Sequence, residues 1–393
     1  MNDSRRATLS YDPVLLVAIF GLVGFGLVMV YSSSAITAQD KLGDGFFFLK
    51  RQAFAAALGL GAMAVAMKLG YRRMARLAYP LLILAVLLLI VVLIPGLGTK
   101  VGGAKRWIRF PGVSIQPAEI AKVAWVIYLS YSLAKKREKV QHFSIGFLPH
   151  LGLAGVLVVL CMLEPDFGSS VALLFLMFVM LFAAGAKLSW LVGSVLLAIP
   201  FAYTAIATSE YRMKRITAFL DPWANRQGSG YQVAESLMSI GSGGMTGLGL
   251  GDGRQKLFFL PEAHTDFIFA IIGEELGLLG VAALIALYGV VIWRGVRASL
   301  SATEPFGTYL GLGLTTLIGF QAVVNMSVAM GLVPTKGLTL PFISYGGSSL
   351  IMLMGAAGLL LSISGAADGG KRRVKAVKVS KAELPVGGAE APA

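Results

Sequence analysis

The chain is poor in charge and has one cysteine. Only 14% of its 393 residues are charged and 56% are hydrophobic, which gives a mean hydropathy of +0.76. Soluble globular proteins have about 25% charged residues, so this composition excludes that class. The lone Cys161 excludes an internal disulfide. It lies in an apolar run, a setting that disfavours a reactive thiolate.

The sequence also lacks a nucleotide-binding signature. Its glycine-rich stretch, 247–253, has no βαβ pattern around it, and no Gly-Lys-Ser/Thr occurs in the chain. We interpret this stretch as a turn. Nucleic acid is a poor explanation of the net charge of +14. Most of the excess lies in short connections and in the tail, where membrane orientation already predicts it.

Apolar runs of membrane-spanning length recur along the whole chain. A bilayer core of about 30 Å requires about 20 residues of helix. The sequence therefore predicts an all-α integral membrane protein with about ten transmembrane helices. The expected spans are 12–34, 46–67, 77–95, 116–134, 146–163, 167–186, 188–208, 265–293, 306–331 and 343–366.

These spans define one polytopic membrane domain, 12–367, preceded by a short N-terminal segment, 1–11. A large loop, 209–264, separates the seventh span from the eighth. The tail 368–393 is rich in Lys and Arg and then in Gly, Ala and Pro. It has few large apolar residues, so we expect it to be disordered.

Lysine and arginine in the short connections predict the orientation. If the N-terminus is cytoplasmic, more than half of the 34 cations fall on the cytoplasmic side. We therefore expect a multi-pass protein of the cytoplasmic membrane with both termini inside. The loop 209–264 then faces outward.

Two groups of cations depart from that orientation rule. They are Lys100, Lys105, Arg106 and Arg109, which surround Trp107, and Arg212, Lys214, Arg215, Arg226, Arg254 and Lys256 in the large loop. Guanidinium and ammonium groups bind phosphate, so together they predict an anion-binding surface. For any single one of them, snorkelling to phospholipid headgroups is the alternative. An outward-facing enzyme lacks ATP and nucleotide sugars, so a lipid pyrophosphate suits this surface.

Asp266 is the acid that stands out most. It ends the segment Pro261-Glu-Ala-His-Thr-Asp266 at the mouth of the eighth span. A carboxylate at such a boundary is costly to desolvate, which indicates a functional site. His264 is close by, but no other His or Cys accompanies it, so we expect no metal site there.

Other polar residues lie at or within the spans. Glu119 and Lys122 are three residues apart, which favours an ion pair on one helical face. Asp166 lies in a turn before the sixth span, where it either caps that helix or faces the site. Glu274 and Glu275 lie deeper. At least one of these two is expected to be a buried structural group, with Gln321 or Asn325 as its partner.

Several segments, taken in order along the chain, resemble the SEDS family (shape, elongation, division and sporulation; FtsW, RodA and SpoVE). They are Gly103-Ala-Lys-Arg-Trp-Ile108, Gln116-Pro-Ala-Glu119, Glu164-Pro-Asp-Phe-Gly168, Phe219-Leu-Asp-Pro-Trp223, 261–277 and 334–349. The early and late motifs look most like the cell-division branch. The elongation and sporulation branches are the alternatives, with the same chemistry.

The resemblance implies a peptidoglycan glycosyltransferase that polymerises lipid II at the outer face of the membrane, at the division septum. It also implies a class B penicillin-binding protein of the FtsI type as a partner, together with other divisome proteins. Asp266 matches the aspartate regarded as essential in the family. Arg106, Trp107, Lys336 and the acids Glu119 and Asp166 match positions of its central cavity.

The chemistry of that reaction favours one carboxylate and several cations. A sugar hydroxyl is a weak nucleophile and needs a base, for which we expect Asp266. Pyrophosphate leaves readily once its charge is neutralised. The expected cations are Lys105, Arg106, Arg212, Arg215 and Lys336, with Trp107 packing on sugar or prenyl chain. No cofactor is predicted, although a divalent cation, Mg²⁺ or Mn²⁺, could share the neutralisation.

Two other classes of function stay open on the sequence alone. A lipid II flippase or transporter would also have ten spans and intramembrane charges. It would translocate lipid without forming glycan. A membrane scaffold that recruits division proteins would tolerate substitution of Asp266.

Overall fold

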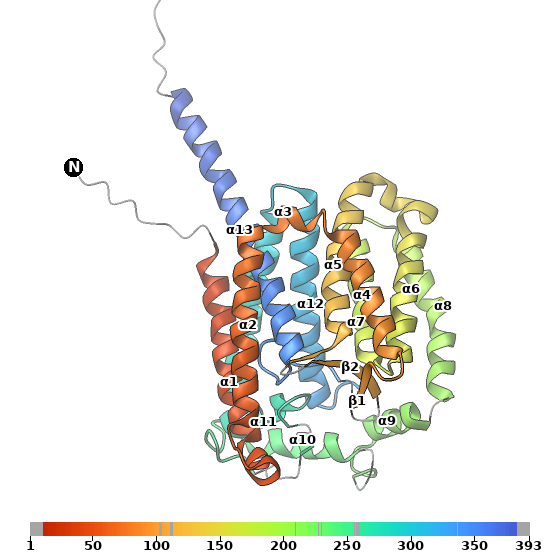
Figure 1. Ribbon diagram of the computed structural model, residues 1–393, viewed down its shortest axis with the longest axis vertical. Coiled ribbons are helices and arrows are strands. Elements are labelled where there is room, and N and C mark those ends of the chain that lie inside the picture. The colour runs from red at the N-terminus through yellow and green to blue at the C-terminus, as the bar shows by residue number, and fades with distance from the viewer. Residues whose placement is uncertain are drawn as a thin grey trace, which may run out of the picture.

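The computed structural model shows a bundle of helices with a small sheet near one end (Figure 1). It describes residues 11–101, 104–110, 113–208, 210–226, 228, 230–254, 256, 260–261, 263–335 and 337–382. The helices are α1 (Pro13–Leu42), α2 (Phe47–Leu69), α3 (Tyr71–Met74), α4 (Ala78–Leu93), α5 (Pro117–Lys136), α6 (Leu148–Leu163), α7 (Phe167–Ala183), α8 (Leu188–Ala207), α9 (Glu210–Leu220), α10 (Tyr231–Ser242), α11 (Ile268–Leu300), α12 (Pro305–Ala329) and α13 (Gly347–Ala382). A 3-10 helix (Arg137–Gln141) and a π-helix (Phe143–Phe147) join α5 to α6.

Every predicted span contains a helix: α1, α2, α4, α5, α6, α7, α8, α11, α12 or α13. In the described part of the chain, six helices are long and apolar enough to cross a membrane, and α4, α7 and α8 contribute shorter apolar helices. α5 falls in neither group. It carries Glu119 and Lys122 near its start and two lysines at its end, which make it less apolar.

The structure differs from the sequence prediction at several places. α1 continues eight residues past 34 and ends at Leu42, where Gly43 adopts a left-handed conformation with φ of 73°. The loop 209–264 contains α9 and α10. Residues 368–382, for which disorder was expected, continue α13 as a helix that projects beyond the bundle (Figure 1). Residues with helical propensity that follow a stable helix can extend that helix, because the costly first turn has already formed.

The fold is helical as predicted, and a small three-stranded antiparallel sheet is added to it. The sheet consists of β1 (Gly98–Val101), β2 (Ala104–Phe110) and β3 (Val113–Ile115), in that spatial order. The strands follow α4 and lead into α5, so they form the connection in which the sequence placed its first group of cations. Short strands that pair with their sequence neighbours need little apolar periodicity. The search for apolar runs of spanning length therefore did not reveal them.

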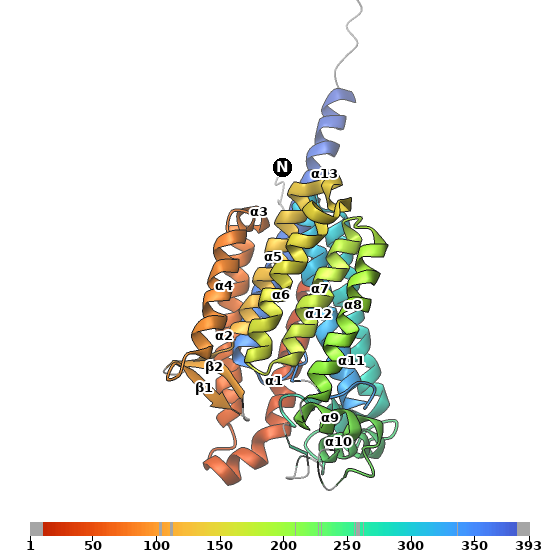
Figure 2. The ribbon, with the colours of Figure 1, turned by 90° about the vertical axis from the view of Figure 1, so that its right-hand side faces the viewer.

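Different elements lie at the two ends of the bundle. The start of α1 and the far end of α13 lie at the end where α3 also lies, whereas α9 and α10 lie at the opposite end (Figures 1 and 2). The backbone N–H of Asp12 donates to Ser364 Oγ at 3.1 Å, and its carboxylate pairs with Arg294 at 2.5 Å. The start of α1 is thus fixed to α13 and to the end of α11.

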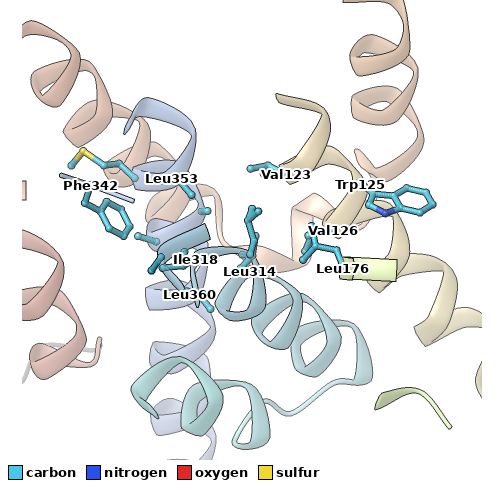
Figure 3. Close-up of a cluster of buried hydrophobic side chains, with 14 of the residues drawn as sticks. Val123, Trp125, Val126, Leu176, Leu314, Ile318, Phe342, Leu353 and Leu360 are labelled. Atoms are coloured by element: carbon cyan, nitrogen blue, oxygen red, sulfur yellow. The ribbon is translucent and has the colours of Figure 1, made fainter. Parts of the chain in front are cut away.

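Close contacts between helices hold the bundle. A Cβ added at Gly358 of α13 would collide with the backbone oxygen of Met63 on α2, and one at Gly295 of α11 would collide with Thr315 on α12. Such small residues let transmembrane backbones approach and gain van der Waals contact. The buried core shown in Figure 3 joins α5, α7, α12 and α13 and includes Trp125, whose indole N–H donates to Leu173 O at 3.1 Å.

α11 is interrupted at Gly277, whose φ of 62° and ψ of −164° are not helical. The glycine-rich stretch 247–253 docks at this break, where the Leu248 N–H donates to Glu274 O at 3.0 Å. A Cβ at Gly277 would collide with the backbone nitrogen of Gly247. The stretch is therefore a turn packed against a helix, in agreement with its interpretation as a turn.

Candidate active site

Asp266 lies in the turns just before α11, which begins at Ile268. Three consecutive carbonyl oxygens of this segment each accept a hydrogen bond from another part of the chain. They are His264 O from Tyr345 N (2.9 Å), Thr265 O from Ser344 Oγ (2.6 Å) and Asp266 O from Asn325 Nδ2 (2.9 Å). The backbone that carries the carboxylate is thus held by α12 and by the segment before α13. Asp266 itself is half-buried.

Asn325 on α12 links this segment to a second one. Its Nδ2 also donates to Leu338 O at 2.7 Å. The expectation that Asn325 or Gln321 partners the glutamates of α11 is wrong, because the amide of Asn325 binds backbone carbonyls and the Gln321 side chain has no hydrogen-bond partner within the described residues. An amide offers two donors in one plane, which suits two carbonyl oxygens.

The Asp266 carboxylate and the Arg106 guanidinium approach the same point. A Cβ added at Gly337 would lie 3.6 Å from Asp266 Oδ2 and 3.7 Å from Arg106 Nη1. The two side-chain ends are therefore no farther apart than the sum of those distances. A larger residue at 337 would stand beside both groups, so glycine leaves that space open.

Arg106 reaches this point from the sheet. The register of β1 and β2 shifts beside it, and Arg106 is left without a partner residue on β1. Such bulges re-aim a side chain. Arg106 Nε donates to Glu164 O at 3.1 Å, and Nη2 donates to Pro165 O. The turn between α6 and α7 thus orients the guanidinium.

Glu164 and Asp166 are both buried acids of this turn, but they differ in their contacts. Neither of the carboxyl oxygens of Glu164 has a hydrogen-bond partner among the described residues. Burial raises the pKa of Glu164 to about 9, and the nearby Asp166 adds to the rise while Arg106 opposes it. Burial disfavours the charged form of a carboxyl group that accepts no hydrogen bond, so such a group stays neutral.

Asp166 caps α7. Its Oδ1 accepts from the Ser169 N–H at 3.0 Å and its Oδ2 from the Ser169 hydroxyl at 2.8 Å. The side-chain amide of Gln116 donates to the same Oδ2 at 3.2 Å. Of the two roles left open by the sequence, capping is the one present here, and it ties the end of the sheet to α7.

Glu119 and Lys122 form the predicted ion pair. The Nζ to Oε1 distance is 2.7 Å, and both side chains are buried in the first turns of α5. Glu119 is thus both paired and shielded from solvent. The pair fits the structural role that the spacing of three residues favoured.

Three of the remaining predicted substrate residues, Lys105, Trp107 and Arg215, lie on β2 and α9, at the same end of the bundle. Arg215 on α9 donates from Nη1 to Thr335 O at 2.9 Å, so α9 contacts the segment that contains Gly337. Arg212 lies three residues earlier on α9, but its side chain is outside the described part. Lys336 lies outside the described residues altogether. Lys105 is exposed and Trp107 is half-buried on β2.

One outward cation of the prediction proves to be structural. Lys256 is buried and pairs with Glu275 at 2.6 Å, and Ser32 Oγ of α1 also donates to that carboxylate at 2.7 Å. Glu274 accepts from the Arg254 N–H at 2.7 Å and from Ser239 Oγ at 3.1 Å. The contacts of Lys256 and Arg254 fasten the loop before Asp266 to α11, and the contact of Ser239 fastens α10 to α11.

Comparison with known proteins places this arrangement in a family. Residues 13–368 match the family of FtsW, RodA and SpoVE, described as cell cycle protein. A probable peptidoglycan glycosyltransferase FtsW of Geobacter metallireducens is 49% identical over 354 residues, which are 90% of this chain and 94% of the relative. Stage V sporulation protein E of Bacillus subtilis is 40% identical over 90% of this chain and 97% of its own.

The chain belongs to the FtsW/RodA/SpoVE family. Solved structures agree with this assignment. A chain from a peptidoglycan synthase complex that coordinates polymerization and crosslinking superposes with a TM-score of 0.77 at 30% identity, over 91% of this chain and 99% of that one. The rod shape determining protein RodA of Thermus thermophilus gives 0.66 at 29% identity, over 91% and 97%. The bundle is therefore the fold of this family.

The FtsW/RodA/SpoVE site offers an acid and guanidinium groups. Among the described residues, no three His, Cys, Asp or Glu side chains are grouped so that they could hold a metal ion. His264 packs against the rings of Phe48 and Tyr345, with centroids 4.5 and 5.6 Å away. A half-buried carboxylate beside fixed cations can accept a proton while the cations stabilise a departing phosphate.

Sequence reasoning singled out segments that the structure brings together, but not the residues that connect them. Asn325, Ser344 and Gly337 lie in or near the late motif and were not assigned to the site. A polar side chain inside an apolar span signals a functional or structural contact, and Asn325 is one. That signal could have found the residue, but not its two partners.

Proposed function

We propose that this protein is a peptidoglycan glycosyltransferase of the cell-division type, which polymerises lipid II into glycan strands at the outer face of the cytoplasmic membrane during septal synthesis. The observation that carries the proposal is the approach of Asp266 and Arg106 to the same point beside Gly337. The family membership of the whole chain adds the reaction class. The sporulation and elongation relatives use the same chemistry and are the second candidates.

In the proposed reaction, the 4-hydroxyl of one lipid II attacks the anomeric carbon of the growing chain. The Asp266 carboxylate accepts the hydroxyl proton as the new oxygen to carbon bond forms. The bond from the anomeric carbon to the phosphate oxygen breaks, and its electron pair leaves with undecaprenyl pyrophosphate. The proton then passes from Asp266 to solvent or to the leaving group. A positioned base of this kind contributes about 10² to 10⁴ in rate.

The cations neutralise the pyrophosphates. Arg106 is the best placed, because the carbonyl oxygens of the 164–165 turn orient its guanidinium beside Gly337. Arg215 on α9 contacts the segment that contains Gly337, because it donates to Thr335 O. Arg212 and Lys336 are close to these two residues in the sequence, and we propose them as further cations of the site. Lys105 and Trp107 extend it along β2. Fixed guanidinium groups bind phosphate without reorganising, which favours the transition state.

Glu119 and Asp166 serve this site as positioning groups. Glu119 is neutralised by Lys122, and Asp166 caps α7 while it binds Gln116. Both are buried, so their contacts set the start of α5 and α7 around the turn that orients Arg106. A divalent cation at the pyrophosphates would share the neutralisation with the cations named above.

The proposed topology has ten spans, with both termini in the cytoplasm. The start of α1 and the far end of α13 lie at the end of the bundle opposite α9 and α10, which supports an outward site if the N-terminus is inside (Figure 1). The loop 209–264 then lies outside. We place the protein in the cytoplasmic membrane at the division septum, by analogy with its division relatives.

We propose a class B penicillin-binding protein as its partner, within the divisome. The structural relative comes from a complex that coordinates polymerization and crosslinking. A polymerase and a crosslinking enzyme act on the same strand, so close association shortens the path between the two active sites.

Purified full-length protein, incubated with lipid II in detergent with and without its cognate penicillin-binding protein, tests this function. The proposal predicts long glycan strands on a gel. A flippase would instead translocate labelled lipid II in liposomes and form no glycan. A scaffold would do neither. Absence of glycan in the presence of the partner would contradict the proposal.

A further inference from the structure

A basic cavity lies at the end of the bundle opposite Asp266. Its volume is about 410 Å³, and it lies where α2 ends and α3 begins, with α13 on its other side. Its cations are Lys68, Arg72 and Arg73, and Tyr11 and Ser362 also line it. The cavity takes no part in the proposed glycosyl transfer.

The turn at Gly70 brings these cations together. Gly70 has a φ of 74° and a ψ of 150°, and the chain turns there between Lys68 and the two arginines. Left-handed conformations of this kind favour glycine. The Tyr71 N–H donates to Ser362 Oγ at 2.8 Å, which fastens the turn to α13.

The charge of the cavity is only partly neutralised. Arg72 pairs with Glu304 at 2.9 Å. Within the part of the chain that the structure describes, neither Lys68 nor Arg73 forms an ion pair. Two cations beside a cavity that is large enough for a headgroup indicate an anionic ligand.

Apolar side chains lead from the cavity along α2. Leu58, Val65 and Leu69 are all exposed. Their spacing of seven and four residues places them on one face of the helix, and that face ends at the cavity. A free phosphate would make no contact with this apolar face, whereas the acyl chains of a phospholipid would lie along it.

We infer that this cavity binds the headgroup of an anionic phospholipid from the leaflet at that end of the bundle. Lys68 and Arg73 bind the phosphate, and Arg72 is held to one side by Glu304. Basic pockets next to membrane helices recognise such lipids, and each cation near the surface adds to the affinity. In the proposed topology this leaflet is the cytoplasmic one.

Native mass spectrometry of the full chain in a neutral detergent tests the site. Phosphatidylglycerol and phosphatidylcholine are titrated separately. We expect preferential retention of phosphatidylglycerol, and we expect Lys68→Gln/Arg73→Gln to weaken it by roughly tenfold or more. The control Lys139→Gln/Arg297→Gln makes the same charge change at two exposed cations outside the cavity, and it should retain the lipid.

The charge-conserving pair Lys68→Arg/Arg73→Lys keeps the test independent of folding, and it should retain the preference. Any of four results would overturn the inference. The first is binding of phosphatidylglycerol by Lys68→Gln/Arg73→Gln as tightly as by the wild type. The second is an equal loss of binding in the control pair, and the third is binding of phosphatidylcholine as tightly as phosphatidylglycerol. The fourth is displacement of the lipid by millimolar inorganic phosphate, which would make the cavity a site for free anions.

Discussion

Asn325 Nδ2 donates to the carbonyl oxygen of Asp266 at 2.9 Å, and the same nitrogen donates to Leu338 O at 2.7 Å. One buried amide on α12 therefore fixes the segment that carries the carboxylate against the segment that carries Gly337. The space in which Asp266 and Arg106 approach each other therefore depends on how these two segments are held relative to each other.

Replacing Asn325 by leucine is expected to lower the rate of glycan formation by about a hundredfold, because misplacement of a catalytic group by about 1 Å costs that much. Two carbonyl oxygens also lose a donor, so the protein should lose about 1–3 kcal/mol of stability. The matched control is Gln321→Leu, at a buried position of the same helix whose amide has no hydrogen-bond partner in the described structure. Equal losses in both variants would count against a positioning role for Asn325.

Glu164 should make stability depend on pH. Its folded-state pKa of about 9 lies above the ordinary value of 4.5. Between these values the folded protein keeps a proton that the unfolded chain has released, so the free energy of unfolding falls as pH rises. Glu164→Gln removes this dependence. Measured at pH 5, 7 and 9, the melting temperature of the variant should rise relative to that of the wild type as pH increases. A constant difference between the two melting temperatures would refute the assignment.

Lys256 and Glu275 form a buried ion pair with Nζ and Oε1 2.6 Å apart, and the exposed pair of Lys214 and Glu210 has a similar distance of 2.7 Å. Lys256→Met leaves a buried carboxylate without its partner and should cost about 3–5 kcal/mol. Lys214→Met should cost far less, because solvent screens an exposed pair. Thermal unfolding of the two variants checks the contrast, and a similar loss in both would show that the loop before Asp266 is not held by Lys256.

Much of the fold follows from local properties of the sequence. Apolar length is such a property, so each expected span contains a helix. Asp266 also stood out locally, because a carboxylate at the edge of an apolar run has few structural explanations. The ion pair of Glu119 and Lys122 followed from their spacing on one helix.

The contacts between distant segments could not be predicted in the same way. Lys256 looked like an outward cation, and only its approach to Glu275 and Ser32 shows it to be buried. The break at Gly277 that accepts the glycine-rich turn depends on a packing partner about 30 residues away. The bulge that aims Arg106 at the 164–165 turn depends on strand register, which the spans do not set.

The most direct test is polymerisation of lipid II by purified Asp266→Asn protein with its penicillin-binding partner. The substitution removes the base and keeps the size of the side chain. Asp252→Asn, at an exposed aspartate in the same loop, is the control. We predict that Asp266→Asn lowers the rate of glycan formation by about 10² to 10⁴ while Asp252→Asn leaves it unchanged. Glycan formation by Asp266→Asn at the wild-type rate would contradict the account.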